Sequence, residues 1–315
     1  MADFHCPVGA VTRGTDECIY CGMCTATTRE EMASASAIIR SYVREFAQAR
    51  LRGMAIKKIA VCGKGGSGKS TITSLMARSL CDFGYRCTVI DTDESNMGLH
   101  RKLGMDQCPE QLITCLPRFS IGKDTQFDTS WMTQDPLLLS QIPEPFIVHN
   151  GDLSFMVSGK IDDPYQGCAC TMAEVTKNLM FNLCPEDREV ILVDHSAGIE
   201  SFGRGMEQAC DTVLIVVEPS FEAIDLAKKI QYLSESMGVR RVRAIVNKTL
   251  DEEQEEYIQD ALIENGIRYL GCVASCRDLA MANLKGTLSE NNSAFSQIRK
   301  ITSLMLDEAE MSYKH

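Results

Sequence analysis

The sequence predicts an α/β protein with a doubly wound, mostly parallel sheet, preceded by a small cysteine-rich module. From Lys57 onward, short apolar runs alternate with longer amphipathic segments, which is the pattern of a parallel sheet covered on both faces. The first fifty residues lack this alternation and contain four closely spaced cysteines. We therefore place a domain boundary near Gly53, between residues 1–52 and residues 53–315.

The strands and helices follow from the spacing of apolar residues. The predicted strands are Ile59–Val61, Val89–Ile90, Val190–Val193, Val213–Val217 and Val242–Val246. The predicted helices are Arg29–Arg50, Lys69–Phe83, Ala173–Phe181, Phe221–Met237, Glu253–Glu264 and an amphipathic C-terminal segment, Phe295–Met305. Between Leu103 and Asn150 five prolines interrupt the pattern, which predicts an irregular insertion at the functional edge of the sheet.

Composition excludes several classes of protein. A chain of 315 residues, 44% hydrophobic, is neither disordered nor fibrous. Its formal charge of −11 disfavours nucleic acid as a partner. No run approaches the roughly 20 apolar residues of a membrane span, and the first residues lack the features of a secretory signal, so we expect a cytoplasmic protein without membrane association. In a reducing compartment, its 15 cysteines indicate metal ligands or core residues rather than disulfides.

The most specific motif follows the first predicted strand of the sheet. The run from Gly63 to Ser70 satisfies G-x-x-x-x-G-K-S between a strand and a helix. Glycines let backbone N–H groups turn toward phosphates, and the helix adds its positive N-terminal end. We expect Lys69 to contact the β- and γ-phosphates and Ser70 to ligate Mg²⁺. The predicted nucleotide contacts are Gly63, Lys64, Gly65, Gly66, Ser67, Gly68, Lys69, Ser70 and Thr71.

Three acidic residues follow apolar strands in register with this loop. Asp91 and Asp93 lie just past the second strand, where a carboxylate can orient the attacking water or hold the hydration shell of the metal. Asp194 ends the apolar run Val190–Val193 and fits the position of a carboxylate that faces Mg²⁺ through water.

Asn247 and Lys248 close a further strand and resemble the base-contact position of nucleoside triphosphatases. The guanine-reading N-K-x-D pattern is not met, because Leu250 stands in its last place. ATP is therefore favoured over GTP.

Lys64, a second lysine inside the loop, resembles the signature lysine of the deviant Walker A class of P-loop ATPases. This class includes the nitrogenase iron protein, the Min-type division ATPases and metal-insertion ATPases. The resemblance implies that Lys64 reaches the nucleotide of a partner subunit in a homodimer. It also implies that Asp93 orients the attacking water and that residues from Asp194 to Glu200 form the second switch segment.

Cys168 and Cys170 form a C-x-C pair just before a predicted helix. Two thiolates one residue apart cannot complete a tetrahedral site, but two pairs across a dimer axis provide four sulfurs. Such a site fits Zn²⁺, Ni²⁺ or a bridging iron–sulfur cluster. Buried or redox-reactive cysteines are the alternative interpretation.

Together these features resemble the nickel-insertion accessory ATPases of carbon monoxide dehydrogenase, the CooC type. The resemblance covers roughly Ile56 to Leu306 and rests on the phosphate loop with Lys64 and on four further segments: Ser158–Ile161 with Gly167–Cys170, Asp194–Glu200, Gly203–Gly205 and Val217–Ser220. It implies metal binding by the C-x-C pair at the dimer interface. It also implies nucleotide-controlled delivery of metal to a carbon monoxide dehydrogenase or acetyl-CoA synthase client.

The motifs also allow three other functions. An ATP-dependent electron donor similar to the nitrogenase iron protein could use Cys168, but no cysteine lies between Gly198 and Gly205, where its second cluster ligand belongs, and the next is Cys210. A localisation switch of the Min or Par type would make the C-x-C pair irrelevant. A pure electron carrier would need only the N-terminal cysteines.

The N-terminal module has the spacing of an iron–sulfur site. Cys18, Cys21 and Cys24 form C-x-x-C-x-x-C, which lets a tight loop present three thiolates to one [4Fe–4S] cluster. Cys6, which precedes Pro7, is the expected fourth ligand because it resembles the proline-flanked cysteine of bacterial ferredoxins. A four-thiolate zinc site is the rival interpretation.

The remaining cysteines have simpler interpretations. We expect small core residues at Cys62, Cys81, Cys87, Cys115, Cys184 and Cys210. His195 is either a nucleotide sensor in the second switch segment or a solvent-facing loop residue.

Overall fold

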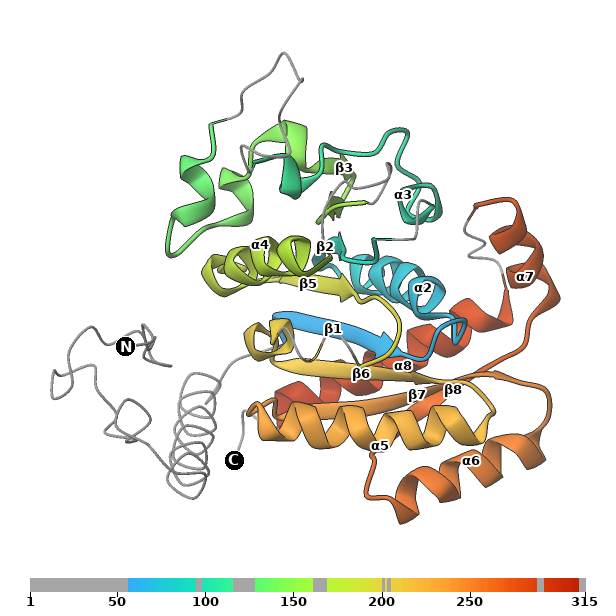
Figure 1. Cartoon of the computed structure of the whole chain (residues 1–315). Coiled ribbons are helices and arrows are strands. Elements are labelled where there is room, and N and C mark those ends of the chain that lie inside the picture. Colours follow the sequence, from blue (N-terminus) through green and yellow to red (C-terminus); the bar gives the residue numbers. More distant parts are fainter. Residues whose placement is uncertain are drawn as a thin grey trace, which may run out of the picture.

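The computed structural model describes residues 56–94, 98–115, 128–160, 169–199, 202, 205–287 and 292–311. Within these ranges eight strands form one sheet in the order β3-β4-β2-β5-β1-β6-β7-β8. Every neighbouring pair is parallel except β3 and β4, which are antiparallel. Helices lie on both sides of this sheet (Figure 1). The prediction of an α/β protein with a mostly parallel sheet is confirmed.

The strands are β1 (Lys58–Gly63), β2 (Arg86–Asp91), β3 (Val148–Asn150), β4 (Leu153–Val157), β5 (Glu189–Asp194), β6 (Thr212–Val217), β7 (Arg241–Thr249) and β8 (Tyr269–Ala274). The α-helices are α2 (Lys69–Asp82), α3 (Leu99–Lys102), α4 (Ala169–Asn182), α5 (Phe221–Ser236), α6 (Glu252–Glu264), α7 (Arg277–Leu284) and α8 (Ser293–Met311). A short 3₁₀ helix, η8 (Met206–Ala209), precedes β6.

All five predicted strands of the sheet are present, as β1, β2, β5, β6 and β7. The prediction missed β3, β4 and β8, and the short helices α3 and α7. Strand β8 carries Gly271 in its middle, which breaks the apolar run that marks a buried strand. The N-terminal module and its linker helix lie outside the described residues, so the division at residue 53 stays a prediction.

The helix starts follow local chemistry. Ser220 caps α5 by accepting a hydrogen bond from the amide of Ala223, and Asp251 caps α6 by accepting one from Gln254 at 2.9 Å. Helix α2 differs, because its N-cap is Gly68 in the left-handed conformation and no side chain caps it. No described side chain therefore caps this helix start, which is the end of a helix that binds anions.

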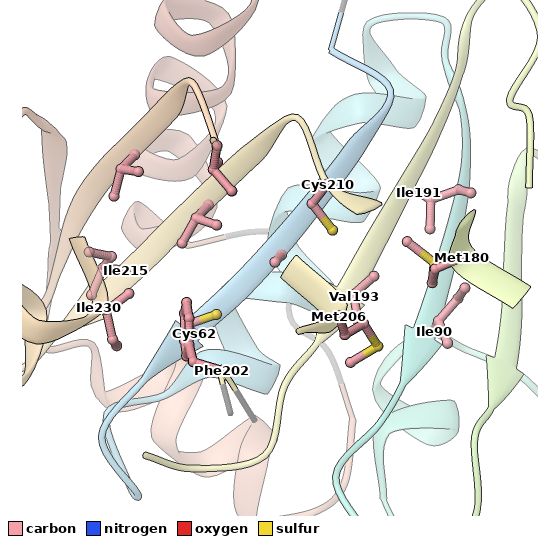
Figure 2. Close-up of a cluster of buried hydrophobic side chains, with 14 of the residues drawn as sticks. Cys62, Ile90, Met180, Ile191, Val193, Phe202, Met206, Cys210, Ile215 and Ile230 are labelled. Atoms are coloured by element: carbon pink, nitrogen blue, oxygen red, sulfur yellow. The ribbon is translucent and has the colours of Figure 1, made fainter. Parts of the chain in front are cut away.

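Strand alternation sorts the core into two apolar layers. On β1, Ile59 and Val61 face the layer built with α2 and α8, whereas Ala60 and Cys62 face the layer built with α4 and α5. Figure 2 shows part of the second layer, where Cys62 and Cys210 lie among aliphatic and sulfur-containing side chains. The core prediction is correct for four cysteines and wrong for Cys184, which is exposed, and for Cys81, which is half-buried.

The insertion between Leu103 and Asn150 consists mainly of 3₁₀ turns where it is described. Trp131 and Phe146 pack in it with ring centroids 5.5 Å apart. The amide of Leu137 donates to the carbonyl of Asn182 at 2.9 Å, which ties the insertion to the end of α4. The described part of the predicted irregular segment thus packs against α4.

The close packing of α8 on β8 depends on one glycine. Gly271 has φ of +158°, and a Cβ built there would lie 2.7 Å from Cγ1 of Ile301. Ile301 is 2% exposed, between α2 and the sheet. Ile301 can therefore pack against β8 only because Gly271 has no side chain.

Replacing Ile301 by alanine should lower the free energy of unfolding by about 2–5 kcal/mol, because it opens a cavity that α8 cannot close. Leu304→Ala is the matched control, since Leu304 on the same helix is 51% exposed and should change stability by less than about 0.5 kcal/mol. Chemical denaturation followed by circular dichroism measures both. Equal effects for the two variants would contradict this packing.

Candidate nucleotide-binding site

The loop from Gly63 to Lys69 joins the end of β1 to the start of α2. Two of its glycines are required sterically. Gly63 has φ of +147°, and a Cβ there would collide with the backbone oxygen of Val216 on β6. Gly68 has φ of +97°, and its Cβ would collide with the side-chain amide of Asn247. The loop therefore packs closely against the ends of β6 and β7. At Gly63 and Gly68 its backbone has a conformation that only glycine adopts readily.

Asn247 and Lys248 hold this loop in place. Nδ2 of Asn247 donates to the carbonyl of Ser67 at 2.7 Å, and Nζ of Lys248 donates to the carbonyl of Gly66. Both residues thus fix loop carbonyls from the end of β7. The structure assigns them this positioning role, and a contact with the base stays a prediction.

Several polar atoms in the loop suit a phosphate ligand. Lys69 is 7% exposed, and its Nζ donates to the carbonyl of Lys64 at 3.2 Å. Oγ of Ser67 is buried and has no hydrogen-bond partner among the described residues. A buried hydroxyl without a protein partner can donate to a phosphate oxygen bound in the loop. Thr71 differs, because its hydroxyl already donates to Asn283 at 3.2 Å.

Asp194 joins the loop helix to the centre of the sheet. Its carboxylate accepts hydrogen bonds from Oγ of Ser70 at 2.6 Å and from Oγ1 of Thr73 at 3.1 Å. Burial raises the pKa of Asp194 to about 6, although the Ser70 bond and nearby Lys69 oppose this rise. A hydroxyl and a carboxylate side by side are the oxygen donors that Mg²⁺ prefers. Ser70 and Asp194 therefore fit the predicted magnesium site.

Lys160, which no sequence motif marked as a site residue, forms a buried ion pair at the end of β2. Its Nζ lies 2.7 Å from Oδ2 of Asp91 and also donates to the carbonyl of Asp93. The amide of Asp93 in turn donates to Oδ1 of Asp91 at 3.0 Å. Lys160 and Asp91 thus fix the backbone position of Asp93, the predicted water-orienting residue.

Lys64 points to acidic residues of its own chain. Its Nζ lies 3.1 Å from Oε1 of Glu218 and 3.8 Å from Oε2 of Glu222, and donates to Oγ of Ser220 at 3.5 Å. These three residues stand where β6 ends and α5 begins. The lysine is 38% exposed, so a partner molecule can reach it.

The predicted cysteine ligands lie where the structure gives no side-chain positions. The N-terminal ligands Cys6, Cys18, Cys21 and Cys24 lie outside the described residues, as does Cys168. Cys170 lies in the first turn of α4, without a described side chain. His195 is 1% exposed, so the interpretation of a solvent-facing loop residue is wrong. No helix in the described ranges has the length and apolar character needed to cross a membrane.

The family model described as the CobQ/CobB/MinD/ParA nucleotide binding domain matches residues 58–289. The chain belongs to this family. The match runs from β1 past α7, so it includes the loop, Asp194 and Asn247. The protein is therefore an ATPase with a P-loop fold, which confirms the predicted class of enzyme.

Individual relatives agree with this assignment. An uncharacterized ATP-binding protein of Methanocaldococcus jannaschii is 33% identical over 253 residues, which cover 79% of this chain and 99% of the relative. The carbon monoxide dehydrogenase accessory protein CooC of Rhodospirillum rubrum is 32% identical over 208 residues, which cover 64% of this chain and 78% of CooC.

Solved structures share the fold. MinD of Pyrococcus horikoshii, complexed with Mg-ADP, has a TM-score of 0.60 at 15% identity, over 82% of this chain and 99% of MinD. A MinD chain from the Aquifex aeolicus MinC:MinD complex has a TM-score of 0.56 at 21% identity, over 78% of this chain and 94% of that chain.

Lys160→Met should lower the free energy of unfolding by about 3–5 kcal/mol, because it leaves the Asp91 carboxylate buried without its cation. The double variant Lys160→Met/Asp91→Leu should recover most of this loss, since both charges are then absent. Urea denaturation of the two variants and the unmodified protein measures the difference. A double variant as unstable as the single one would contradict a coupled pair.

Proposed function

We propose that this protein is an ATP-driven metal-delivery ATPase that matures a metalloenzyme of the carbon monoxide dehydrogenase or acetyl-CoA synthase type, with nickel as the cargo. The observation that carries this proposal is the 32% identity over 208 residues to the accessory protein CooC. The nucleotide site supplies the driving reaction. The C-x-C pair, which the sequence places at the start of α4, supplies thiolates for the cargo.

The working form in this proposal is a homodimer that shares its nucleotides. Lys64 leaves Glu218 and Ser220 of its own chain and binds the nucleotide of the second copy. Exposure of Lys64 and its weak surface ion pairs keep the cost of this exchange low. ATP bound between two copies therefore stabilises the closed dimer.

Each residue of the site has a part in hydrolysis. Lys69 and the loop N–H groups bind the β- and γ-phosphates. Ser70 and Asp194 would hold Mg²⁺, which would neutralise phosphate charge. Asp93, fixed through its backbone by Asp91 and Lys160, orients the water that attacks the γ-phosphorus. The bond from this phosphorus to the bridging oxygen breaks, and ADP is the leaving group.

Closure of the dimer builds the cargo site. Cys168 and Cys170 of both copies meet across the axis, so four thiolates surround one metal ion in the ATP state. Hydrolysis separates the copies and leaves each with two thiolates, too few for a tetrahedral site. The ion then passes to the client enzyme.

The N-terminal cysteines extend this proposal. A [4Fe–4S] cluster held by Cys6, Cys18, Cys21 and Cys24 would supply or gate electrons during metal loading or client activation. A reductase that bridges one cluster between subunits is less well supported, because no cysteine lies between Gly198 and Gly205. The MinD likeness extends to the fold alone.

Metal content should depend on both nucleotide and the C-x-C pair. Protein purified anaerobically should bind close to one Ni²⁺ per dimer more with a non-hydrolysable ATP analogue than with ADP, because only the closed dimer has the four-thiolate site. The double variant Cys168→Ser/Cys170→Ser should lose this difference while it retains N-terminal iron. Equilibrium dialysis with elemental analysis measures both metals.

The matched control is Cys108→Ser/Cys184→Ser, which removes two exposed cysteines of the same chain. It should behave like the unmodified protein. Nickel binding that is identical in every nucleotide state, or identical in both double variants, would overturn the metal-delivery proposal.

Glu218→Gln should strengthen the ATP-dependent dimer about two- to fivefold per site, because it weakens the contact that holds Lys64 in its own chain. Glu256→Gln, which removes an exposed charge on α6, is the control and should leave association unchanged. Sedimentation equilibrium with a non-hydrolysable ATP analogue gives the dissociation constants. A dimer weakened by Glu218→Gln would contradict the lysine exchange.

A further inference from the structure

A buried group of metal-binding side chains lies just before the nucleotide loop, on the face of the sheet that α4 and α5 cover. It consists of Cys62 on β1, His195 after β5 and Glu207 on η8. One ligand atom from each lies within 4.8 Å of the other two. The exposed fractions of the three residues are 1%, 1% and 0%.

Strand alternation explains why these side chains meet. Asp194 faces α2, where it bonds to Ser70, so the next residue, His195, faces the opposite layer. The amide of His195 donates to the carbonyl of Val61 at 3.1 Å, which places its ring beside the side chain of Cys62. The 3₁₀ turn before β6 brings Glu207 to the same point.

The surroundings of this group are apolar. Figure 2 shows Cys62 close to Phe202, with Val193, Met206 and Cys210 in the same part of the layer. The side chains of Phe202, Val193 and Met206 offer no strong hydrogen bond to the imidazole or the carboxylate. The group must satisfy its own polar atoms or bind something that does.

The polar atoms of the group are unsatisfied within the part of the chain that the structure describes. Neither ring nitrogen of His195 and neither carboxylate oxygen of Glu207 has a hydrogen-bond partner. Their closest approach, Nδ1 of His195 to Oε1 of Glu207, is 3.6 Å, which is longer than a hydrogen bond. Four unpaired buried atoms at one point are rare in native proteins and call for a ligand.

The group has one proton to lose when a cation binds. Metal binding would release the proton of the Cys62 thiol to solvent, as it does at other thiolate sites.

We propose that Cys62, His195 and Glu207 bind a divalent transition-metal ion of the Zn²⁺ or Ni²⁺ kind inside each protomer. One sulfur, one imidazole nitrogen and one carboxylate oxygen are a donor set that such ions accept. Bond lengths of about 2.0–2.3 Å place tetrahedral donors roughly 3.5 Å apart, so the three side chains need to converge by about 1 Å. Three protein ligands leave the fourth position open for exchange.

The site is distinct from the proposed C-x-C site. It needs no second copy of the chain, and it does not depend on the proposed function. Its ligand His195 adjoins Asp194, so an ion on one side of the sheet and Mg-nucleotide on the other bind to consecutive residues of the switch segment. If nucleotide binding changes the affinity for the ion, ion binding changes the affinity for the nucleotide by the same factor.

The test uses the full chain in the Cys168→Ser/Cys170→Ser background, which removes the C-x-C site and leaves the N-terminal cysteines constant. Equilibrium dialysis with Zn²⁺ and with Ni²⁺ measures ions bound per protomer. His195→Gln and Glu207→Gln should each lower the number by one, or weaken this site at least tenfold. The rise in melting temperature that the metal produces in the background protein should also disappear in both variants.

Cys87→Ser is the matched control, because Cys87 is an equally buried cysteine of the opposite layer. It should keep the bound ion and the metal-dependent rise in melting temperature. Loss of the ion in Cys87→Ser as well would overturn the assignment.

A second measurement needs no variant of these ligands. Co²⁺ added to the background protein, after its N-terminal cysteines are changed to serine, should give the charge-transfer absorption of a cobalt–thiolate bond. Absence of this absorption would overturn the proposal, as would full metal binding by His195→Gln. Either result would leave a buried histidine–glutamate pair without metal, and the C-x-C proposal would stand unaffected.

Discussion

The hydrogen bond from Oγ of Ser70 to Oδ2 of Asp194, 2.6 Å long, ties the first turn of α2 to the end of β5. It exists because β1 and β5 are adjacent and parallel, with Val61 in register with Asp194. The loop that follows β1 therefore ends beside the carboxylate that ends β5. This is the carboxyl edge of the strands, where open α/β sheets bind their ligands.

Sheet alternation gives the same position a second consequence. Asp194 and His195 are consecutive and lie on opposite sides of the sheet, one against α2 and the other against η8. A backbone movement at Asp194 and His195 would therefore change the contacts with α2 and the contacts with η8 together. The nucleotide site and the proposed metal site would thus share two consecutive residues of the backbone, Asp194 and His195. This arrangement suits a protein whose proposed task couples hydrolysis to metal transfer.

The sequence indicates those parts of the candidate site that have a local signal, either a contiguous motif or an acidic residue at the end of an apolar run. The loop from Gly63 to Ser70 and the strand-ending Asp194 follow from spacing and strand order alone. Lys160, paired with Asp91, could not be assigned in this way, because β4 and β2 are neighbours only in the folded sheet. The sequence marks His195 only as a nucleotide sensor or a loop residue and does not mark Glu207, because nothing in their local sequence indicates that the fold brings both of them to Cys62 on β1. Strand β8 was missed because Gly271 interrupts its apolar run. The same glycine allows α8 to pack closely on β8, because it leaves room for Ile301.

We propose that Lys64 of one protomer completes the nucleotide site of a second protomer. The ATPase rate per protomer, measured over a hundredfold range of protein concentration, tests this. For the unmodified protein the rate should rise with concentration and reach a plateau as dimers form, whereas Lys64→Ala should stay low and flat throughout. A rate per protomer that is constant across the range, and unchanged in Lys64→Ala, would show that each protomer hydrolyses ATP without the lysine of another.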